Sequence, residues 1–460
     1  MSGMATLERY RGRKVGVLGL ARSGLAAAKA LTAAGATVLA WDDRPQALAS
    51  ATSLGLVPGT PADVADLALL IPSPGVPFTH PRTHKVIAAA RTAGIPIRGD
   101  VDLFAELVAP RRIVGVTGTN GKSTTTALIQ HLLATAGVDA VRGGNIGEAV
   151  FDLDQGGPER VFVLELSSFQ LDLAPTLRCD VAVWLNLTPD HLDRHGDLDG
   201  YIRSKSRIFE HQKPGDAAVI GVDDEPSREI ARALREQGRL VIQVSVGSVP
   251  EGGVGVRDGV LVDALEGQGR EVADLGLRKN LPGSHNHQNA AAAYAACRAL
   301  GLDASEAVLG LPSFVGLPHR LEQVAATGGI RFVNDSKATN PDAAARALAS
   351  FPHIFWIAGG RPKPGGFTSL RPHLGGVRRA FLIGEAAPEI EADLGDVVPV
   401  ERSGSLEVAL AAATEAARRS GSEESVVLLA PACASYDQFA NFEARGDTFR
   451  ALARAAGAAQ

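Results

Sequence analysis

The sequence alternates short β-branched runs with Ala- and Leu-rich runs along almost its whole length. This pattern is typical of doubly wound parallel sheets covered by helices. It starts afresh three times, at strands expected over residues 14–18, 113–116 and 330–333. A chain of 460 residues is also too long for one hydrophobic core. The sequence therefore predicts an α/β protein with three domains.

Proline and glycine mark the junctions between the three stretches, near residues 109–110 and 316–318. We therefore expect domains over residues 1–105, 106–316 and 317–460. Two of the expected strands are continuously apolar, as strands buried on both faces are. The strands expected beyond the three starts lie at 37–40, 161–166, 181–187, 354–358, 380–383 and 426–429.

Composition excludes several classes of protein. The net charge is −5, so no basic excess attracts nucleic acid or anionic lipid. The three cysteines, Cys179, Cys297 and Cys433, are too sparse for a disulfide framework and are expected to be small buried hydrophobes. The N-terminal residues are polar, and no apolar stretch is long enough to span a bilayer. We expect a cytoplasmic protein that binds neither nucleic acid nor membrane.

The strongest local signal is the segment Thr117–Thr124, which reads TGTNGKST between an expected strand and an expected helix. Such a turn aims backbone N–H groups and the positive end of a helix at one point, where a phosphate can bind. Lys122 can reach the β- and γ-phosphates, and the Ser123 hydroxyl can hold Mg²⁺. Strict Walker spacing would place glycine at Val116, so the loop is a shortened variant; the alternative is a turn without a ligand. The expected nucleotide-binding residues are Gly118, Thr119, Asn120, Gly121, Lys122, Ser123 and Thr124.

This loop resembles that of the Mur ligases and of folylpolyglutamate synthetases, and further motifs extend the resemblance to the Mur ligases over nearly the whole chain. Each motif is weak alone, but together and in this order they are highly specific. The resemblance implies an N-terminal Rossmann-like domain for a UDP substrate, a central P-loop domain for ATP and a mobile C-terminal Rossmann-like domain. The motifs are SPG at 73–75, GNIG at 144–147, ELSSFQ at 165–170, DHLDR at 190–194, HN at 285–286, NDSKATN at 334–340 and PACASYDQF at 431–439.

Within the family, the segments 336–340 (SKATN) and 430–433 (APAC) favour D-glutamate as the amino acid. The resemblance implies an ATP-dependent monomeric ligase of peptidoglycan biosynthesis. It would join D-glutamate to UDP-N-acetylmuramoyl-L-alanine through an acyl phosphate.

Three alternatives stay open at this point. The acceptor could be another amino acid, as in the alanine-, diaminopimelate- or glutamyl-adding relatives, or the chain could be a P-loop ATPase that regulates a partner protein. The third is an NAD(P) dehydrogenase, suggested by the segment 19–24. There Ala21 interrupts the glycine fingerprint, which counts against that class.

The resemblance also implies two Mg²⁺ ions held by Ser123, Glu165, His191 and a carbamate on Lys205. A neutral lysine amine can capture CO₂ and so become an anion that coordinates metal. From residue pattern alone, a surface salt-bridging lysine and a hydrogen-bonded loop histidine are the commoner interpretations. A zinc helix formed by His191 and His195 is rejected, because the glutamate of that motif is missing. His195 has no matching role and is expected to be structural.

The remaining site residues follow from the same resemblance. Arg22 departs from the apolar residue expected in the family, and Lys363 could instead be a solvated charge. For the UDP-linked substrate they are Arg22, Ser23, Asp42, Asp43, Arg44, Ser73, Gly75, Asn145 and Ser167; near ATP they are Asn289, Arg320, Asp335 and Lys337; for D-glutamate they are Thr339, Lys363, Ser435 and Phe442.

Overall fold

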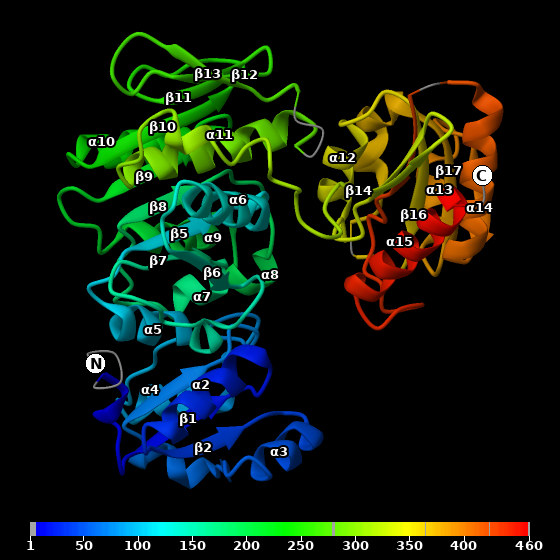
Figure 1. Ribbon diagram of the computed structural model, residues 1–460. Helices are drawn as coiled ribbons and strands as arrows, with labels where there is room; N and C mark the ends of the chain where they lie inside the picture. The colour runs from blue at the N-terminus through cyan, green and yellow to red at the C-terminus, as the bar shows by residue number, and fades with distance from the viewer. Residues whose placement is uncertain (1–5, 278–280, 364, 423, 459–460) are drawn as a thin grey trace. The chain divides into compact units, whose positions relative to one another are not determined.

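The computed structural model describes residues 6–277, 281–363, 365–422 and 424–458 (Figure 1). The chain divides into two compact units. The first comprises Met1–Ala273 and Gln288–Pro312, and the second Asp274–His287 and Ser313–Gln460. Helix α11 (Ser284–Ala299) therefore begins in the second unit and ends in the first.

The N-terminal part of the first unit is a parallel sheet in the order β3-β2-β1-β4, four strands within the described ranges. The central strand β1 is buried on both faces, because Val15 and Val17 belong to one apolar cluster and Leu18 to another on the opposite face. The strands are β1 (Lys14–Leu18), β2 (Thr37–Trp41), β3 (Val57–Pro58) and β4 (Leu69–Pro72); the helices are α2 (Arg22–Ala33), α3 (Pro45–Thr52), η1 (Pro61–Asp66), α4 (Lys85–Thr92) and α5 (Asp100–Val108).

The larger sheet of this unit has the order β13-β12-β11-β10-β9-β8-β5-β7-β6 in the described residues. Strands β6 to β11 run parallel, with β5 (Ile113–Thr117) fully buried between β7 and β8. Its other strands are β6 (Ala140–Gly144), β7 (Val161–Glu165), β8 (Val181–Trp184), β9 (Ala217–Gly221), β10 (Leu240–Val246), β11 (Val254–Arg257), β12 (Val260–Asp263) and β13 (Arg270–Asp274). Its helices are α6 (Lys122–Thr135), η2 (Val150–Asp152), α7 (Ser168–Asp172), α8 (Leu192–His195), α9 (Leu198–Ser206), η3 (Arg207–Phe209), α10 (Glu225–Glu236) and η4 (Glu306–Val308).

The two sheets of the first unit share one apolar core. Phe104 of α5 meets Phe162 of β7 edge to face, with ring centroids 5.1 Å apart. Leu7 and Leu107 belong to the same buried cluster. This shared core explains why the two sheets form one compact unit, while the domain bounds at 105 and 106 stay a prediction.

The second unit is built on a sheet in the order β14-β15-β19-β16-β17-β18, as far as the described residues go. Separate apolar clusters cover its two faces, one of which includes Phe449 of the last helix. The strands are β14 (Glu322–Thr327), β15 (Ile330–Asn334), β16 (Ile354–Gly359), β17 (Val377–Ile383), β18 (Val400–Gly404) and β19 (Ser425–Leu429). The helices are α12 (Pro341–Leu348), η5 (Thr368–Gly376), α13 (Ala387–Leu394), α14 (Leu406–Ser420) and α15 (Phe442–Ala458).

The parallel sheets that the sequence predicts also carry two antiparallel hairpins in the described residues. Strands β11 and β12 are antiparallel, as are β14 and β15. Each pair is joined by two residues with positive φ, Asp258-Gly259 and Gly328-Gly329. Such two-residue turns connect antiparallel strands, whereas parallel strands need a longer crossover.

Most of the expected strands occur within a residue or two of their predicted ends. The strand expected at 181–187 is shorter, because β8 ends at Trp184 and the chain then turns toward the phosphate loop. All three cysteines are buried and unpaired, as expected. No helix in the described ranges is long and apolar enough to cross a membrane.

Candidate functional site

The phosphate loop, defined here as residues 117–124, lies between β5 and the first turn of α6. Gly121 precedes the helix with φ +85°, and a Cβ there would lie 2.2 Å from Asn289 Oδ1. Only glycine fits such a position. Asn289, expected beside ATP, therefore lies against the loop in the first unit. Ser123 is buried and Thr124 is half-buried in the first turn of α6.

A residue outside the predicted set holds this loop in place. Asn186 follows β8 and is 8% exposed. Its Oδ1 accepts from the Asn120 backbone N–H at 3.0 Å, and its Nδ2 donates to the Asn120 carbonyl at 3.2 Å. The same Nδ2 lies 3.3 Å from Gln288 Oε1, and Thr119 N–H donates to the Asn186 carbonyl at 2.9 Å. A polar residue just beyond a buried strand is the signal that could have revealed it.

Two lysines converge on the same loop. Lys122 Nζ donates to the carbonyls of Gly118 and Thr119, at 3.0 and 2.9 Å. Lys205 of α9 also reaches the Gly118 carbonyl, at 2.8 Å, although its side chain is only 1% exposed. Burial and the nearby Lys122 charge hold the pKa of Lys205 well below its ordinary value. The structure thus excludes the surface interpretation of Lys205.

Glu165 ends β7 and is 3% exposed. Its Oε1 accepts a hydrogen bond from Asn145 Nδ2 at 2.7 Å, and its buried Oε2 has no partner among the described residues. Buried carboxylate oxygens are normally hydrogen-bonded or bound to a cation. This oxygen is therefore able to accept a cation.

His191 stands before the short helix α8 in the left-handed region, with φ +54°. Its ring is half-exposed and contacts Phe169, with centroids 5.0 Å apart. Partial burial lowers its pKa. His195 is buried: its Nε2 lies 2.9 Å from Ser168 Oγ and its ring stacks on Phe169. These contacts agree with the structural role expected for His195.

Most of the residues expected for the UDP-linked substrate line one cavity of about 590 Å³, called here the N-terminal cavity. It lies at the carboxyl ends of β1, β2 and β4 and reaches the segment after β6. Its lining includes Arg22, Ser23, Asp42, Asp43, Arg44, Ser73, Gly75 and Asn145, together with His84 and Gln170, which were not among the expected site residues.

Two side chains shape the loops of this cavity. Asp42 accepts from the Leu20 backbone N–H at 2.7 Å and pairs with Arg44, whose guanidinium is the main reason that the pKa of Asp42 falls to about 2. Ser73 Oγ donates to the Gly19 carbonyl at 2.7 Å. Both residues therefore have structural partners in addition to any ligand.

Ser167 and Arg194 both make structural hydrogen bonds that were not predicted. Ser167 caps α7: Gln170 N–H donates to its Oγ at 3.2 Å, and the Gln170 side chain returns to the Ser167 N–H. Its substrate role stays a prediction. Arg194 was not selected, yet it donates to the carbonyls of Gly75 and Val76, at 3.0 and 3.1 Å. It thereby ties the turn beside the N-terminal cavity to α8.

In the second unit, the predicted residues gather at the carboxyl ends of β15, β16 and β19. Lys337 Nζ lies 3.8 Å from the centroid of the Phe442 ring. Asp335 accepts from the Leu321 N–H at 3.2 Å, and burial raises the pKa of this carboxyl to about 7 despite the Arg320 charge. The remaining predicted residues lie on the loops here: Thr339 is half-buried, Ser435 is buried after β19, and Lys363 is exposed on the loop after β16.

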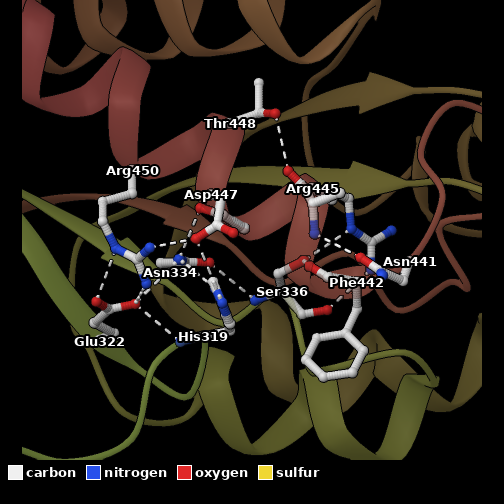
Figure 2. A network of polar contacts seen from close by, with 12 residues as sticks. His319, Glu322, Asn334, Ser336, Asn441, Phe442, Arg445, Asp447, Thr448 and Arg450 are labelled. Atoms are coloured by element: carbon white, nitrogen blue, oxygen red, sulfur yellow. Dashed lines mark hydrogen bonds and ion pairs between the residues drawn. The ribbon is translucent and has the colours of Figure 1, made fainter.

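A polar network supports this edge of the sheet (Figure 2). Asn334 Nδ2 donates to the Gly446 carbonyl at 3.0 Å and lies 3.1 Å from His319 Nδ1. His319 has φ +63°, and its N–H donates to Glu322 Oε2 at 2.9 Å. A Cβ on Gly446 would lie 2.1 Å from His319 Nδ1, so glycine is required where α15 passes this turn. The network orients the turn that carries Arg320.

Comparison with known proteins decides the family. Residues 116–297 match the Mur ligase middle domain, and residues 319–433 match the Mur ligase, glutamate ligase domain. UDP-N-acetylmuramoylalanine–D-glutamate ligase from Caulobacter sp. (strain K31) is 50% identical, over 99% of this chain and 98% of that protein. The enzyme of the same name from Rhodospirillum rubrum is 49% identical, over 98% of this chain and 96% of its own. The chain belongs to the Mur ligase family.

Solved structures of Mur ligases share the fold. MurF ligase from Thermotoga maritima in complex with ADP aligns with a TM-score of 0.59 at 18% identity, over 98% of this Mur ligase and 97% of that chain. UDP-N-acetylmuramate–alanine ligase MurC from the same organism aligns with a TM-score of 0.58 at 19% identity, over 96% of this Mur ligase and 99% of that chain. The resemblance found in the sequence is thus confirmed.

In this Mur ligase, Asn186→Ala is expected to raise the KM for ATP by about tenfold, because the Asn120 N–H loses its acceptor and the loop loses its fixed shape. Initial-rate measurements against ATP concentration test this. Gln212→Ala is the matched control: Gln212 is equally buried and holds the Cys179 and Ala217 carbonyls. It should lower stability without changing the KM for ATP; equal effects of both variants would contradict the role of Asn186.

Proposed function

We propose that this Mur ligase adds D-glutamate to UDP-N-acetylmuramoyl-L-alanine in an ATP-dependent reaction of peptidoglycan synthesis. The observation that carries the proposal is sequence identity near 50% to D-glutamate ligases over almost the entire chain, both units included. The alignment covers both the phosphate loop and the loops after β15 and β19. No large region of the chain lies outside the alignment, so there is no room for an unrelated substrate-binding domain.

We assign residues 1–105 to a Rossmann-like UDP-substrate domain, 106–316 to a P-loop ATP-binding domain and 317–460 to a Rossmann-like domain for the amino acid. Three separate sheets support this division. The reaction is placed in the cytoplasm, where UDP-linked precursors and ATP meet. We also propose that the protein is a monomer.

The phosphate loop is proposed to bind the ATP phosphates through residues 118–124, with Asn289, Arg320, Asp335 and Lys337 as further nucleotide contacts. The loop supports this proposal because it leads directly into the N-terminus of α6, where the positive end of the helix dipole favours an anion. Lys122 lies beside the loop carbonyls and would neutralise charge at the terminal phosphate.

Two Mg²⁺ ions are proposed to be held by Ser123, Glu165, His191 and a carbamate on Lys205. The unpartnered Glu165 Oε2 fits a cation ligand, and oxygen donors are those that Mg²⁺ prefers. Lys205 fits carbamylation because burial favours its uncharged amine, the form that reacts with CO₂. When bound, the ions would neutralise charge on the phosphates.

The N-terminal cavity is proposed to hold the UDP-linked substrate. Arg22, Ser23 and Ser73 are polar groups suited to a diphosphate, while Asp42, Asp43 and Arg44 stand where a ribose or base would lie. Asn145 and His191 are proposed to face the muramoyl-alanine part, and Ser167 is retained as a further candidate.

D-Glutamate is proposed to bind through Thr339, Lys363, Ser435 and Phe442 of the second unit. A lysine and two hydroxyls are suited to the two carboxylates of this substrate. The side chain of Lys363 is exposed, so it is accessible to a carboxylate of D-glutamate.

The proposed reaction has two steps. The carboxylate of the UDP-linked substrate attacks the γ-phosphate of ATP, forming an acyl phosphate and ADP. The amine of D-glutamate then attacks the acyl carbon, and phosphate leaves as the amide forms. The main contribution of the protein is alignment and exclusion of water, which can lower a barrier by about 7–11 kcal/mol.

Phosphate release tests this function. With ATP, Mg²⁺ and UDP-N-acetylmuramoyl-L-alanine present, release should require D-glutamate and should not respond to L-alanine or diaminopimelate. Product mass should increase by one glutamyl residue. Hydrolysis of ATP that ignores every amino acid would instead favour the regulatory ATPase and contradict the proposal.

A further inference from the structure

One buried arginine joins three strand ends of the second unit. Arg445 of α15 is 1% exposed. Its Nε donates to Ser336 Oγ at 3.0 Å, and its Nη2 donates to the carbonyls of Ser336 and Cys433, at 2.9 and 3.1 Å. Its Nη1 lies 3.4 Å from the carbonyls of Gly359 and Ala434. Figure 2 shows the side chain pointing from α15 toward the segment that follows β15.

The charge of Arg445 is not neutralised by an ion pair. All its hydrogen-bond acceptors are backbone carbonyls or a hydroxyl, and Arg445 forms no ion pair with any residue that the structure describes. Burial lowers its pKa to about 10, which leaves the guanidinium protonated at neutral pH. By contrast, Arg450 on the same helix pairs with Glu322 and Asp447. A buried cation without an ion-pair partner is costly, although the Asp437 carboxylate favours the charged form of Arg445.

The acceptors of Arg445 adjoin the segments proposed to bind D-glutamate. Ser336 stands three residues before Thr339, between the proposed nucleotide contacts Asp335 and Lys337, and its Oγ donates to the Phe442 carbonyl at 2.8 Å. Ala434 immediately precedes Ser435, and Gly359 begins the loop that carries Lys363. The relative positions of these loops therefore depend on one planar, multidentate group.

We propose that Arg445 is a positioning residue for the amino-acid acceptor, a role that rests on the proposed function. It sets the spacing of the three loops around the dicarboxylate. It also adds a positive charge that attracts this substrate. Lysine cannot replace it fully, because a single ammonium group cannot donate along the fork directions that reach all three strand ends.

Steady-state kinetics of Arg445→Lys, Arg445→Gln and Arg445→Met tests the proposal. The KM for D-glutamate should rise at least about tenfold in every variant and least in the lysine variant, which keeps the charge. The KM for the UDP-linked substrate should change less than about twofold. The KM for ATP should rise less than the KM for D-glutamate, because only Ser336 among the acceptors of Arg445 adjoins proposed nucleotide contacts. If Arg445→Met does not fold, the KM values of Arg445→Lys and Arg445→Gln are sufficient to test the proposal.

Arg450→Met is the matched control, because it removes an arginine from the same helix but leaves the three loops tied. It should lower the melting temperature without raising the KM for D-glutamate. A rise in the D-glutamate KM equal to that of the Arg445 variants, or a uniform rise for all three substrates, would overturn the proposal. A wild-type enzyme without D-glutamate-dependent phosphate release would overturn the proposed function itself. A responsive wild type with unchanged Arg445 variants would overturn only this inference.

Discussion

Replacing Lys122 by alanine is expected to lower the ligation rate by at least about 10²- to 10³-fold, because charge developing on the terminal phosphate loses its cation. The fold should persist, since α6 is held by buried side chains such as Leu128, Ile129 and Leu132 rather than by Lys122. Phosphate release and thermal unfolding, measured on the same sample, test both parts of the prediction.

Lys14→Ala provides the control for loss of a lysine in the first unit. Lys14 Nζ lies 3.0 Å from Asp66 at the surface, so its removal should change stability slightly and turnover hardly at all. Unchanged turnover in Lys122→Ala would exclude the phosphate role. Loss of the folded state would mean that Lys122 serves the loop structure instead.

Replacing Lys205 is expected to lower the rate by a similar factor of about 10² or more, because the proposed Mg²⁺ site would lose an anionic ligand. Lys205→Met is the preferred variant, since it keeps most of the buried volume of a side chain that is 1% exposed. The rescue experiment uses a second variant, Lys205→Ala, because the smaller side chain leaves room for an added molecule. Small carboxylic acids such as formate or acetate should restore part of its activity by supplying the missing oxygen ligands.

Two measurements separate carbamylation from a plain lysine role. Wild-type protein equilibrated with ¹³C-labelled bicarbonate should give a carbamate ¹³C signal that is lost in Lys205→Met. The same carboxylic acids should fail to rescue Lys122→Ala, in which the missing group is a cation. Full activity of the Lys205 variants without added acid, or no carbamate signal in the wild type, would exclude the proposed ligand.

The N-terminal cavity shows how far the order of motifs can predict a site. Its predicted residues come from segments that each follow a parallel strand, and such segments meet at one edge of a sheet. Eight residues of the lining were selected from the sequence, and the other lining residues, Leu18 and Val76 among them, were not. His84 was missed because it precedes α4 and reaches the cavity only through the packing of that helix.

Ser167 and Lys205 show where local reasoning was incomplete. The Ser167–Gln170 spacing is that of a capping box, a signal already present in the sequence that accounts for the serine without any ligand. For Lys205 the residue pattern favoured an exposed side chain. Its contact with Gly118, 87 residues earlier, places it in the interior instead.

The sequence by itself determined the α/β class, the turn between β5 and α6 and the membership of the family, because strand periodicity, turn chemistry and ordered motifs are local properties of the chain. Tertiary structure alone decided that Asn186 holds the loop, that Lys205 is buried beside it and that Arg445 ties three strand ends. Each of these contacts joins residues distant in sequence. Their hydrogen-bond partners are mostly backbone groups, which carry no residue-specific signal, so only the packing of strands and helices brings them within bonding distance.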